Sequence, residues 1–282
     1  GPEVDNSYVA LVEQVQVNPN LNKSNFKIVY TPNHGTSYIN AMRVFKDCGY
    51  DVYPVLSQCD PDPDFKGTKS PNPEDPASYE EAIKLAKEID ADLICMTDPD
   101  GDRVGLACKN KVGDYVLLTG NESAAILLDY ILSEKRKKGF LVNNGVVYNT
   151  VVTSTLGEKI AKSYGVSTES FLTGFKYIGD RIQFYEEHGG PEFVFGYEES
   201  YGCLIKPFVR DKDGIQAILL YCEVAVFYSK LGITLDEAYH NLGLRYGFHK
   251  SKLFNIYFKG SKGSIKMKQI MEKVMNDPFT EL

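Results

Sequence analysis

The chain has 282 residues, of which 43% are hydrophobic and 24% are charged, so it can bury a substantial core and is long enough for two domains. The net charge of -7 at pH 7 disfavours a nucleic-acid surface, which needs clustered Lys and Arg. No apolar run reaches the roughly 18 residues that a membrane span needs, and we therefore expect a cytoplasmic protein that binds neither nucleic acid nor membrane.

The first half of the chain alternates strand-like and helix-like patterns. Short apolar runs predict strands, and apolar residues three or four positions apart predict helices. A Pro-rich loop over residues 60–73 interrupts the alternation. Strands are expected at residues 27–30, 51–55, 93–97 and 104–107, and helices at residues 36–47 and 77–88.

The second half repeats this order, and both halves place an acidic turn between their third and fourth strands. This repetition predicts an α/β fold of two similar three-layer α/β/α domains with mixed, mostly parallel sheets. The basic run 135–138 ends a helix and is interpreted as a solvated terminus. The expected helices are 122–137, 154–164, 177–188 and 214–231, and the expected strands are 146–148, 166–170, 193–196 and 203–205.

These patterns predict three segments. Residues 1–118 form the first domain, residues 119–243 form the second, and residues 244–282 are a linker or the start of an incomplete following domain. In this last segment a strand is expected at residues 254–258, followed by a helix rich in Lys and Met. The six cysteines are scattered without a Cys-x-x-Cys pair, which indicates buried thiols rather than disulfides or zinc ligands.

The turn at residues 98–103 carries three carboxylates, those of Asp98, Asp100 and Asp102. Carboxylates at alternate positions of a tight loop can converge on one point, where they need a cation to remain ionised together, and a hard metal such as Mg²⁺ is the natural candidate. The alternative is an ordinary acidic hairpin turn. An EF-hand fits less well, because Arg103 and Lys109 occupy the positions of its Gly and Glu.

Three further loops carry candidate binding residues. The turn Glu198–Ser200, between Tyr and Gly residues, suits a polyol such as a sugar. The loops at residues 173–176 and 210–214 each precede a helix and could meet an anion there. His34 follows the first strand, where open α/β sheets build ligand crevices. The alternatives are surface turns and N-cap loops with solvated charges.

Six segments together resemble the α-D-phosphohexomutase superfamily, which includes the bacterial phosphoglucomutases and phosphomannomutases. They occur in the order of that family and are spread over most of the chain. They read Thr31-Pro32-Asn33-His34-Gly35-Thr36, Ser70-Pro71-Asn72-Pro73-Glu74, Thr97-Asp98-Pro99-Asp100-Gly101-Asp102-Arg103, Thr173-Gly174-Phe175-Lys176-Tyr177-Ile178-Gly179, Gly196-Tyr197-Glu198-Glu199-Ser200-Tyr201-Gly202 and Arg210-Asp211-Lys212-Asp213-Gly214.

The resemblance implies a Mg²⁺-dependent enzyme that exchanges phosphate between O1 and O6 of a hexose through a bisphosphate intermediate. Its substrates would be glucose or mannose 1- and 6-phosphates and the hexose 1,6-bisphosphate, with the choice of sugar left open. By this resemblance Asp98, Asp100 and Asp102 would hold Mg²⁺, and Arg103 would help to neutralise the transferring phosphoryl group. The implied substrate-binding residues are Thr173, Gly174, Lys176, Glu198, Ser200 and Lys212.

Two segments of this family are missing from the sequence. Its members carry a phosphorylated serine in a Ser-His-Asn-Pro loop of their first domain and a phosphate-binding Ser-Gly-Thr-Glu-Pro segment in their fourth. Neither occurs here, so the chain resembles the second and third domains of a longer mutase. Because the nucleophile is absent, we expect the chain alone to be inactive.

Two alternatives from other classes remain at this point. A haloacid-dehalogenase-type phosphatase also places an acidic Mg²⁺ loop after an apolar strand, although Asp102 replaces the Thr of its motif and the Glu198–Ser200 turn would be unexplained. A non-enzymatic sugar-binding or metal-binding module is the other alternative. Binding of Mg²⁺ and hexose phosphates by the purified chain distinguishes them.

Overall fold

The computed structural model describes residues 1–251 and 256–276. Its contacts define one compact unit, Gly1–His249, and a second that begins at Lys250. The second contains the helix α9 (Gly260–Asn276), which confirms the Lys- and Met-rich helix. Of the strand expected at residues 254–258, residues 254 and 255 lie outside the described residues, and residues 256–258 form no regular structure.

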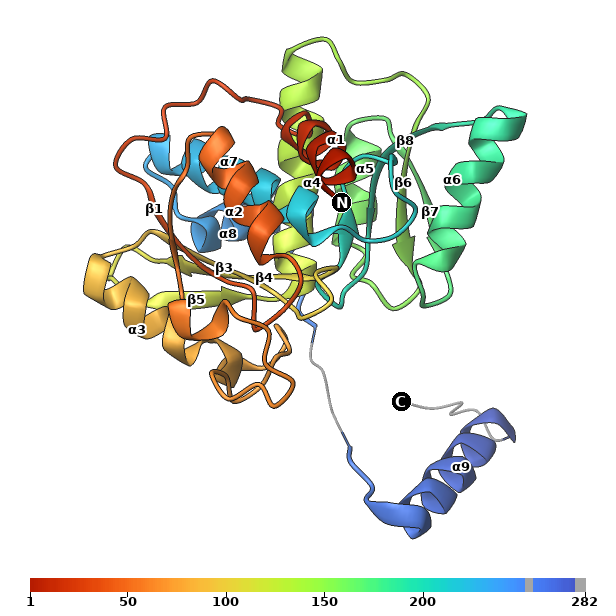
Figure 1. Cartoon of the computed structure of the whole chain (residues 1–282). Helices are drawn as coiled ribbons and strands as arrows, with labels where there is room; N and C mark the ends of the chain where they lie inside the picture. The colour runs from red at the N-terminus through yellow and green to blue at the C-terminus, as the bar shows by residue number, and fades with distance from the viewer. Residues whose placement is uncertain (252–255, 277–282) are drawn as a thin grey trace. The chain divides into compact units, whose positions relative to one another are not determined.

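The first sheet has five strands in the order β2-β1-β3-β4-β5. Figure 1 labels β1, β3, β4 and β5 of this sheet. The first three are parallel, and β4 and β5 are antiparallel to their neighbours. Residues of β1 alternate between two hydrophobic clusters, one with α3 and one with α2 and α7, so helices cover both faces. The elements are α1 (Pro2–Glu13), β1 (Lys27–Thr31), α2 (Tyr38–Asp47), β2 (Asp51–Pro54), α3 (Glu80–Ile89), β3 (Leu93–Thr97), β4 (Val104–Lys109) and β5 (Tyr115–Leu118).

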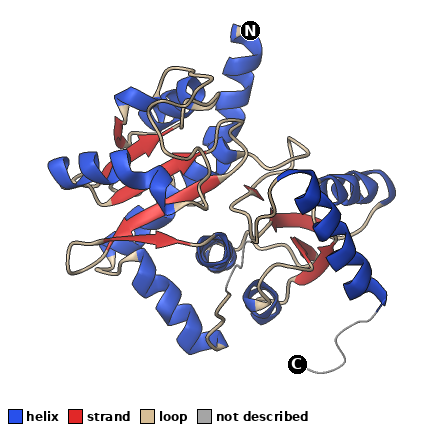
Figure 2. Cartoon of the chain, turned by 90° about the horizontal axis from the view of Figure 1, so that it is seen from below, coloured by secondary structure: helices blue, strands red, loops and turns tan. Residues whose placement is uncertain are grey.

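The second sheet has four strands in the order β7-β6-β8-β9, with β9 antiparallel to β8. Its order matches that of the first four strands of the first sheet, and helices flank both groups of strands (Figure 2). The predicted pair of similar α/β/α layers with mixed sheets is confirmed. The elements are α4 (Gly120–Lys137), β6 (Gly145–Thr150), α5 (Leu156–Ser163), β7 (Ser167–Phe171), α6 (Lys176–His188), β8 (Glu192–Tyr197), β9 (Cys203–Leu204), α7 (Gly214–Lys230) and α8 (Leu235–Tyr246).

Helix α7 joins the two sheets. It contacts β3 and β4 of the first sheet, β9 of the second, and the helices α1, α2 and α4. Every residue of α7 from Gly214 to Val226 is buried, and its apolar side chains belong to one cluster with both sheets. Among the described residues no single helix is long and apolar enough to cross a membrane, and only α7 and α8 taken together, with a bend of 83°, meet that criterion.

Three elements of the compact unit were not expected from the sequence. These are α1, the edge strand β5 and α8. Strand β5 has only four residues and three of them are partly exposed, so its apolar pattern is short and interrupted. Helix α8 begins after Thr234, whose backbone N–H donates to the carboxylate of Glu237 at 3.1 Å. This is one half of a Thr-x-x-Glu capping box, a signal present in the sequence.

Glu223 on α7 ties the segment after α1 to the core. Its buried carboxylate accepts hydrogen bonds through Oε1 from the backbone N–H groups of Val17 and Asn18 and from the hydroxyl of Tyr130, at 3.0, 2.8 and 2.8 Å. Its Oε2 has no hydrogen-bond donor among the described residues. Burial therefore raises the pKa of Glu223, although these three hydrogen bonds oppose the shift.

The Glu223→Gln substitution tests this charge. Because the pKa of Glu223 is higher in the folded chain than its usual value of 4.5, the folded chain holds this proton more tightly than the unfolded chain does. The free energy of unfolding of the wild type should therefore fall relative to that of the variant as pH rises above the usual value. Urea denaturation of both proteins between about pH 4 and pH 8 measures this difference, and a difference that does not change with pH would contradict it.

Candidate functional site

Two acidic turns meet where the sheets approach each other. The first, residues 98–103, follows β3, and the second, residues 198–202, follows β8. The N–H of Val104 donates to the carbonyl of Tyr201 at 2.9 Å, and Arg103 and Gly202 form an antiparallel bridge. The N–H of Gly214, the first residue of α7, donates to the carbonyl of Gly101 at 3.0 Å. The backbone itself therefore fixes both turns and the start of α7 in one place.

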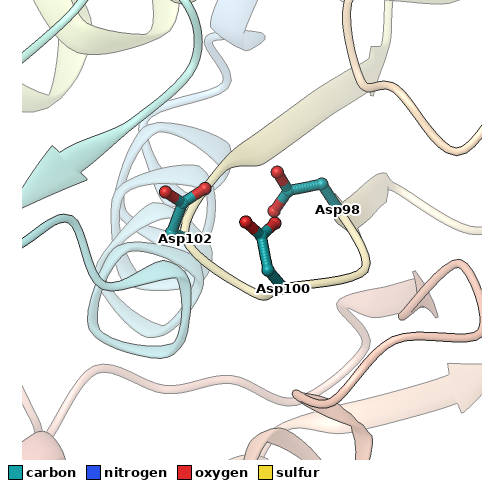
Figure 3. A group of neighbouring side chains, drawn as sticks. All are labelled: Asp98, Asp100 and Asp102. Carbon is teal, nitrogen blue, oxygen red and sulfur yellow. The ribbon is translucent and has the colours of Figure 1, made fainter. Parts of the chain in front are cut away.

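The three aspartates of the first turn converge. Asp98 is buried, Asp100 is exposed and Asp102 is partly buried, and one carboxylate oxygen from each lies within 4.8 Å of the others. Figure 3 shows the three carboxylates gathered on the inner side of the loop between the two strands. Gly101 takes a positive φ of 79°, which a side chain would disfavour, and this sharp turn brings Asp100 and Asp102 together. Three oxygen ligands on one side of a point leave other coordination positions open.

Arg103 holds Asp98 from both ends of its carboxylate. The backbone N–H of Arg103 donates to Oδ1 at 2.9 Å and its Nε donates to Oδ2 at 2.6 Å. Burial nevertheless raises the pKa of Asp98 to about 6, because the hydrogen bonds and charge of Arg103 offset only part of the cost of burying the carboxylate, and Asp100 lies close by. The surroundings of Asp98 therefore disfavour its ionised form, although Arg103 offsets part of this cost.

Lys212 connects the two turns. Its Nζ lies 2.8 Å from Oδ2 of Asp102 in the first turn and 3.8 Å from Oε2 of Glu198 in the second. Only 15% of its side chain is exposed. Burial by itself would lower the pKa of Lys212, but the hydrogen bond to Asp102 and the nearby carboxylates outweigh burial and raise it. The ammonium group is thus fixed between a candidate metal ligand and a candidate sugar ligand.

The two glutamates of the second turn have different partners. Glu198 is 5% exposed and its Oε1 accepts the N–H of Gly174 at 3.0 Å, so the loop before α6 is attached to this turn. Glu199 instead accepts hydrogen bonds from the hydroxyls of Thr150, the last residue of β6, and of Thr153, at 3.0 and 3.4 Å. Sequence analysis did not single out these two threonines, and no spacing rule indicated them, since they lie almost fifty positions from Glu199.

The other predicted substrate-binding residues lie around this centre. Ser200 is partly exposed and its hydroxyl has no hydrogen-bond partner among the described residues. Thr173 and Lys176 are exposed, and the ammonium of Lys176 lies 5.0 Å from the centre of the ring of Tyr177. Of the two lysines, only Lys212 contacts the carboxylates of the two turns in the part of the chain that the structure describes.

A cavity of about 310 Å³ lies beside the first turn. Asp100, Asp102 and Lys212 line it, together with the start of α2 and the loop before α7. A polar concave surface with one cation and several carboxylates suits a small polar ligand better than an apolar one.

His34 has a supporting role. Its Nε2 accepts the N–H of Gly67 at 3.1 Å, which assigns the ring proton to Nδ1, and Nδ1 donates to the carbonyl of Asp60 at 2.7 Å. Both ring nitrogens therefore hold the Pro-rich loop. The prediction of a ligand crevice at this edge of the sheet rests on the neighbouring residues of the loop rather than on the ring of His34.

The Gly214→Ala substitution tests the junction between the first turn and α7. A Cβ atom at this position would lie 2.4 Å from the carbonyl oxygen of Gly101, so either the turn or the start of α7 must move. Overpacking of this kind costs about 1–3 kcal/mol. We expect a lower free energy of unfolding, measured with urea, and a variant as stable as the wild type would show that the junction yields easily.

Two family models match the chain. The model described as phosphoglucomutase/phosphomannomutase, alpha/beta/alpha domain II, matches residues 6–113, and that for domain III matches residues 119–246. Among curated proteins, a phosphoglucomutase of Staphylococcus epidermidis is 36% identical over 263 residues, which are 92% of this chain and 47% of that protein. The chain spans about half the length of the curated relatives it matches.

Solved structures share the fold. The Paramecium phosphoprotein parafusin, a phosphoglucomutase, aligns with a TM-score of 0.65 at 19% identity and covers 98% of this chain and 48% of that one. N-acetylphosphoglucosamine mutase of Aspergillus fumigatus, in complex with GlcNAc-6P and magnesium, aligns with a TM-score of 0.55 at 16% identity, over 82% of this chain and 47% of that one. With its two matched domains in consecutive order, the chain belongs to the α-D-phosphohexomutase superfamily and comprises domains II and III.

Proposed function

We propose that the chain is the central part of a Mg²⁺-dependent phosphohexomutase that interconverts hexose 1-phosphates and hexose 6-phosphates through a bisphosphate intermediate. The observation that carries this proposal is the convergence of the three aspartates beside Arg103 and Lys212. Family membership supports the same reaction class and does not favour the haloacid-dehalogenase alternative.

The donor set fits magnesium. Asp98, Asp100 and Asp102 would hold the ion, since Mg²⁺ prefers carboxylate oxygens and keeps some positions for water or phosphate. Asp102 uses one oxygen for Lys212 and has a second to offer. When bound, Mg²⁺ would supply positive charge for the oxygens of a transferring phosphoryl group. Arg103, held beside Asp98, would add a fixed cation on the same side.

The second turn would bind the sugar. Glu198 and Ser200 offer a carboxylate and a free hydroxyl to sugar hydroxyl groups, and Thr173 and Gly174 lie on the loop attached to Glu198. Lys212 would contact the substrate from between the turns, and Lys176 would approach it from the start of α6. Such polar contacts suit a hexose that must bind in two orientations, with either O1 or O6 toward the metal. The related mutase of Aspergillus fumigatus in complex with GlcNAc-6P and magnesium supports a hexose phosphate.

One prediction of this proposal concerns the metal. We expect the Asp100→Asn variant to bind Mg²⁺ at least about tenfold more weakly than the wild type, because it loses a charged ligand at an exposed position where folding should not suffer. Titration calorimetry with Mg²⁺, repeated with Mn²⁺, measures the affinity.

The matched control is Asp64→Asn, which removes one exposed carboxylate that pairs with Lys66 outside the site. Equal weakening in both variants would indicate nonspecific binding to an acidic surface and would contradict the metal site. Micromolar affinity for Mg²⁺ and for glucose 6-phosphate together would instead favour the non-enzymatic binding module.

Another prediction of this proposal concerns activity. The sequence contains no Ser-His-Asn-Pro segment to carry the phosphoryl group, so the purified chain should not convert glucose 1-phosphate to glucose 6-phosphate. A coupled assay for glucose 6-phosphate, with Mg²⁺ and with a metal-free control, checks this. Turnover above the control, lost in Asp98→Asn, would contradict the expectation that this chain alone is inactive.

A further inference from the structure

A second cavity, of about 690 Å³, lies away from the acidic turns. It lies between the end of α4, one face of α6, the segment after α1, the start of β8 and the residues after β9. Strand β8 begins at Glu192 in the wall of this cavity and ends at Tyr197, directly before Glu198. Because six strand residues span about 20 Å, the cavity and the candidate catalytic site lie at opposite ends of β8.

Most of the wall is apolar. Tyr148 and Phe193 stack with ring centres 6.0 Å apart, Ile131 and Ile182 line the cavity beside them, and the ring of Phe140, 72% exposed, lies at its edge. The volume falls in the range of pockets that hold small organic molecules, roughly 300–1,000 Å³. An apolar body of that size would gain stability by leaving water.

Two lysines place positive charge in the wall of the cavity. Lys135 and Lys206 both line it, and neither forms an ion pair with a residue that the structure describes. Burial, followed by repulsion from Lys206, lowers the pKa of Lys135, although Glu192 opposes the shift. The other carboxylate of the wall, Glu186, already pairs with Arg210. Two ammonium groups therefore face one unpaired carboxylate, that of Glu192.

The position of Lys135 corrects the interpretation of the basic run as a solvated helix end. The other three residues of the run are exposed, whereas Lys135 is partly buried. It lies four positions after Ile131, on the face of α4 that borders the cavity, and the helical period turns it inward. The charge pattern alone did not show which residue of the run would be partly buried in the fold.

Tyr148 offers the cavity a polar group as well as its ring. The residue is 1% exposed and lines the cavity, and its hydroxyl forms no hydrogen bond with a described residue. A hydroxyl can both donate and accept, so a molecule or water in the cavity can hydrogen-bond to it.

We propose that this cavity binds a small amphipathic organic anion, whose apolar ring or chain packs on the Tyr148 and Phe193 wall and whose anionic head lies between Lys135 and Lys206. The head is a carboxylate or a phosphate ester, since both meet two ammonium groups with charge-assisted hydrogen bonds. The site needs no metal and is separate from the proposed hexose phosphate site.

Binding of the fluorescent aromatic anion anilinonaphthalene sulfonate to the whole chain, without Mg²⁺, tests the proposal. We expect saturable binding at one site. Lys135→Met and Lys206→Met keep the apolar stem and remove the charge, and each should weaken binding by about tenfold. Lys162→Met, which removes an exposed charge from α5, is the matched control and should leave the affinity unchanged.

Competition on the wild type gives a readout that does not depend on any variant. Octanoate and phenyl phosphate, which represent the two kinds of head, should compete, and the stronger competitor identifies the head. Inorganic phosphate and benzyl alcohol, which each offer one half of the chemistry, should not. Equal probe affinity in all three lysine variants, or displacement by neither octanoate nor phenyl phosphate, would overturn the proposal whether or not the Mg²⁺ site is present.

Discussion

The hydrogen bonds between the backbones of the two acidic turns are the constraint on which the site depends. Each sheet alone carries one turn with a few carboxylates. The bonds from Val104 to Tyr201 and from Gly214 to Gly101 place these turns side by side and put Lys212 between them. Because backbone groups make these contacts, the arrangement does not rely on the rotamer of any long side chain. The candidate metal ligands and the candidate sugar ligands thus share one fixed frame.

Charge is what connects this frame to the phosphate chemistry that we propose. The first turn concentrates three carboxylates, and two cations, Arg103 and Lys212, border them. Burial of Asp98 makes its ionised form costly, so a divalent ion in the cluster would relieve that cost directly. Lys212 forms ion pairs with a carboxylate of each turn, those of Asp102 and Glu198. A charged ligand bound at one turn would therefore change the electrostatic environment of the other turn through the ammonium group of Lys212.

Local pattern predicted most of the fold. Periodicity and turn residues indicated eight of the strands and six of the helices of the compact unit, and the repeated order of elements indicated two similar sheets. It missed α1, β5 and α8. The partly exposed residues of β5 interrupt its apolar pattern, and the Thr-x-x-Glu signal at the start of α8 was overlooked. The shared core around α7 was not visible either, because it depends on contacts between distant segments.

For the candidate site, too, the sequence indicated the local arrangement of residues but not the contacts between distant segments. The aspartates stand at alternate positions of one turn, so their convergence followed from spacing. The contact of Lys212 with both turns and the hydroxyls of Thr150 and Thr153 on Glu199 join segments far apart in sequence, and only the fold brings them together. The same limit applied to Lys135, since a basic run does not reveal which of its members faces a cavity.

The central position of α7 also bears on how the chain reaches its structure during synthesis. The hydroxyl of Tyr8 donates to Asp213, and the N–H of Val17 donates to Glu223, across 205 and 206 positions. Contacts this distant form late, because the intervening chain must first be made. The first sheet, β2-β1-β3-β4-β5, is therefore synthesised before the helix that covers one of its faces. That face is buried only after the residues of α7 have been made.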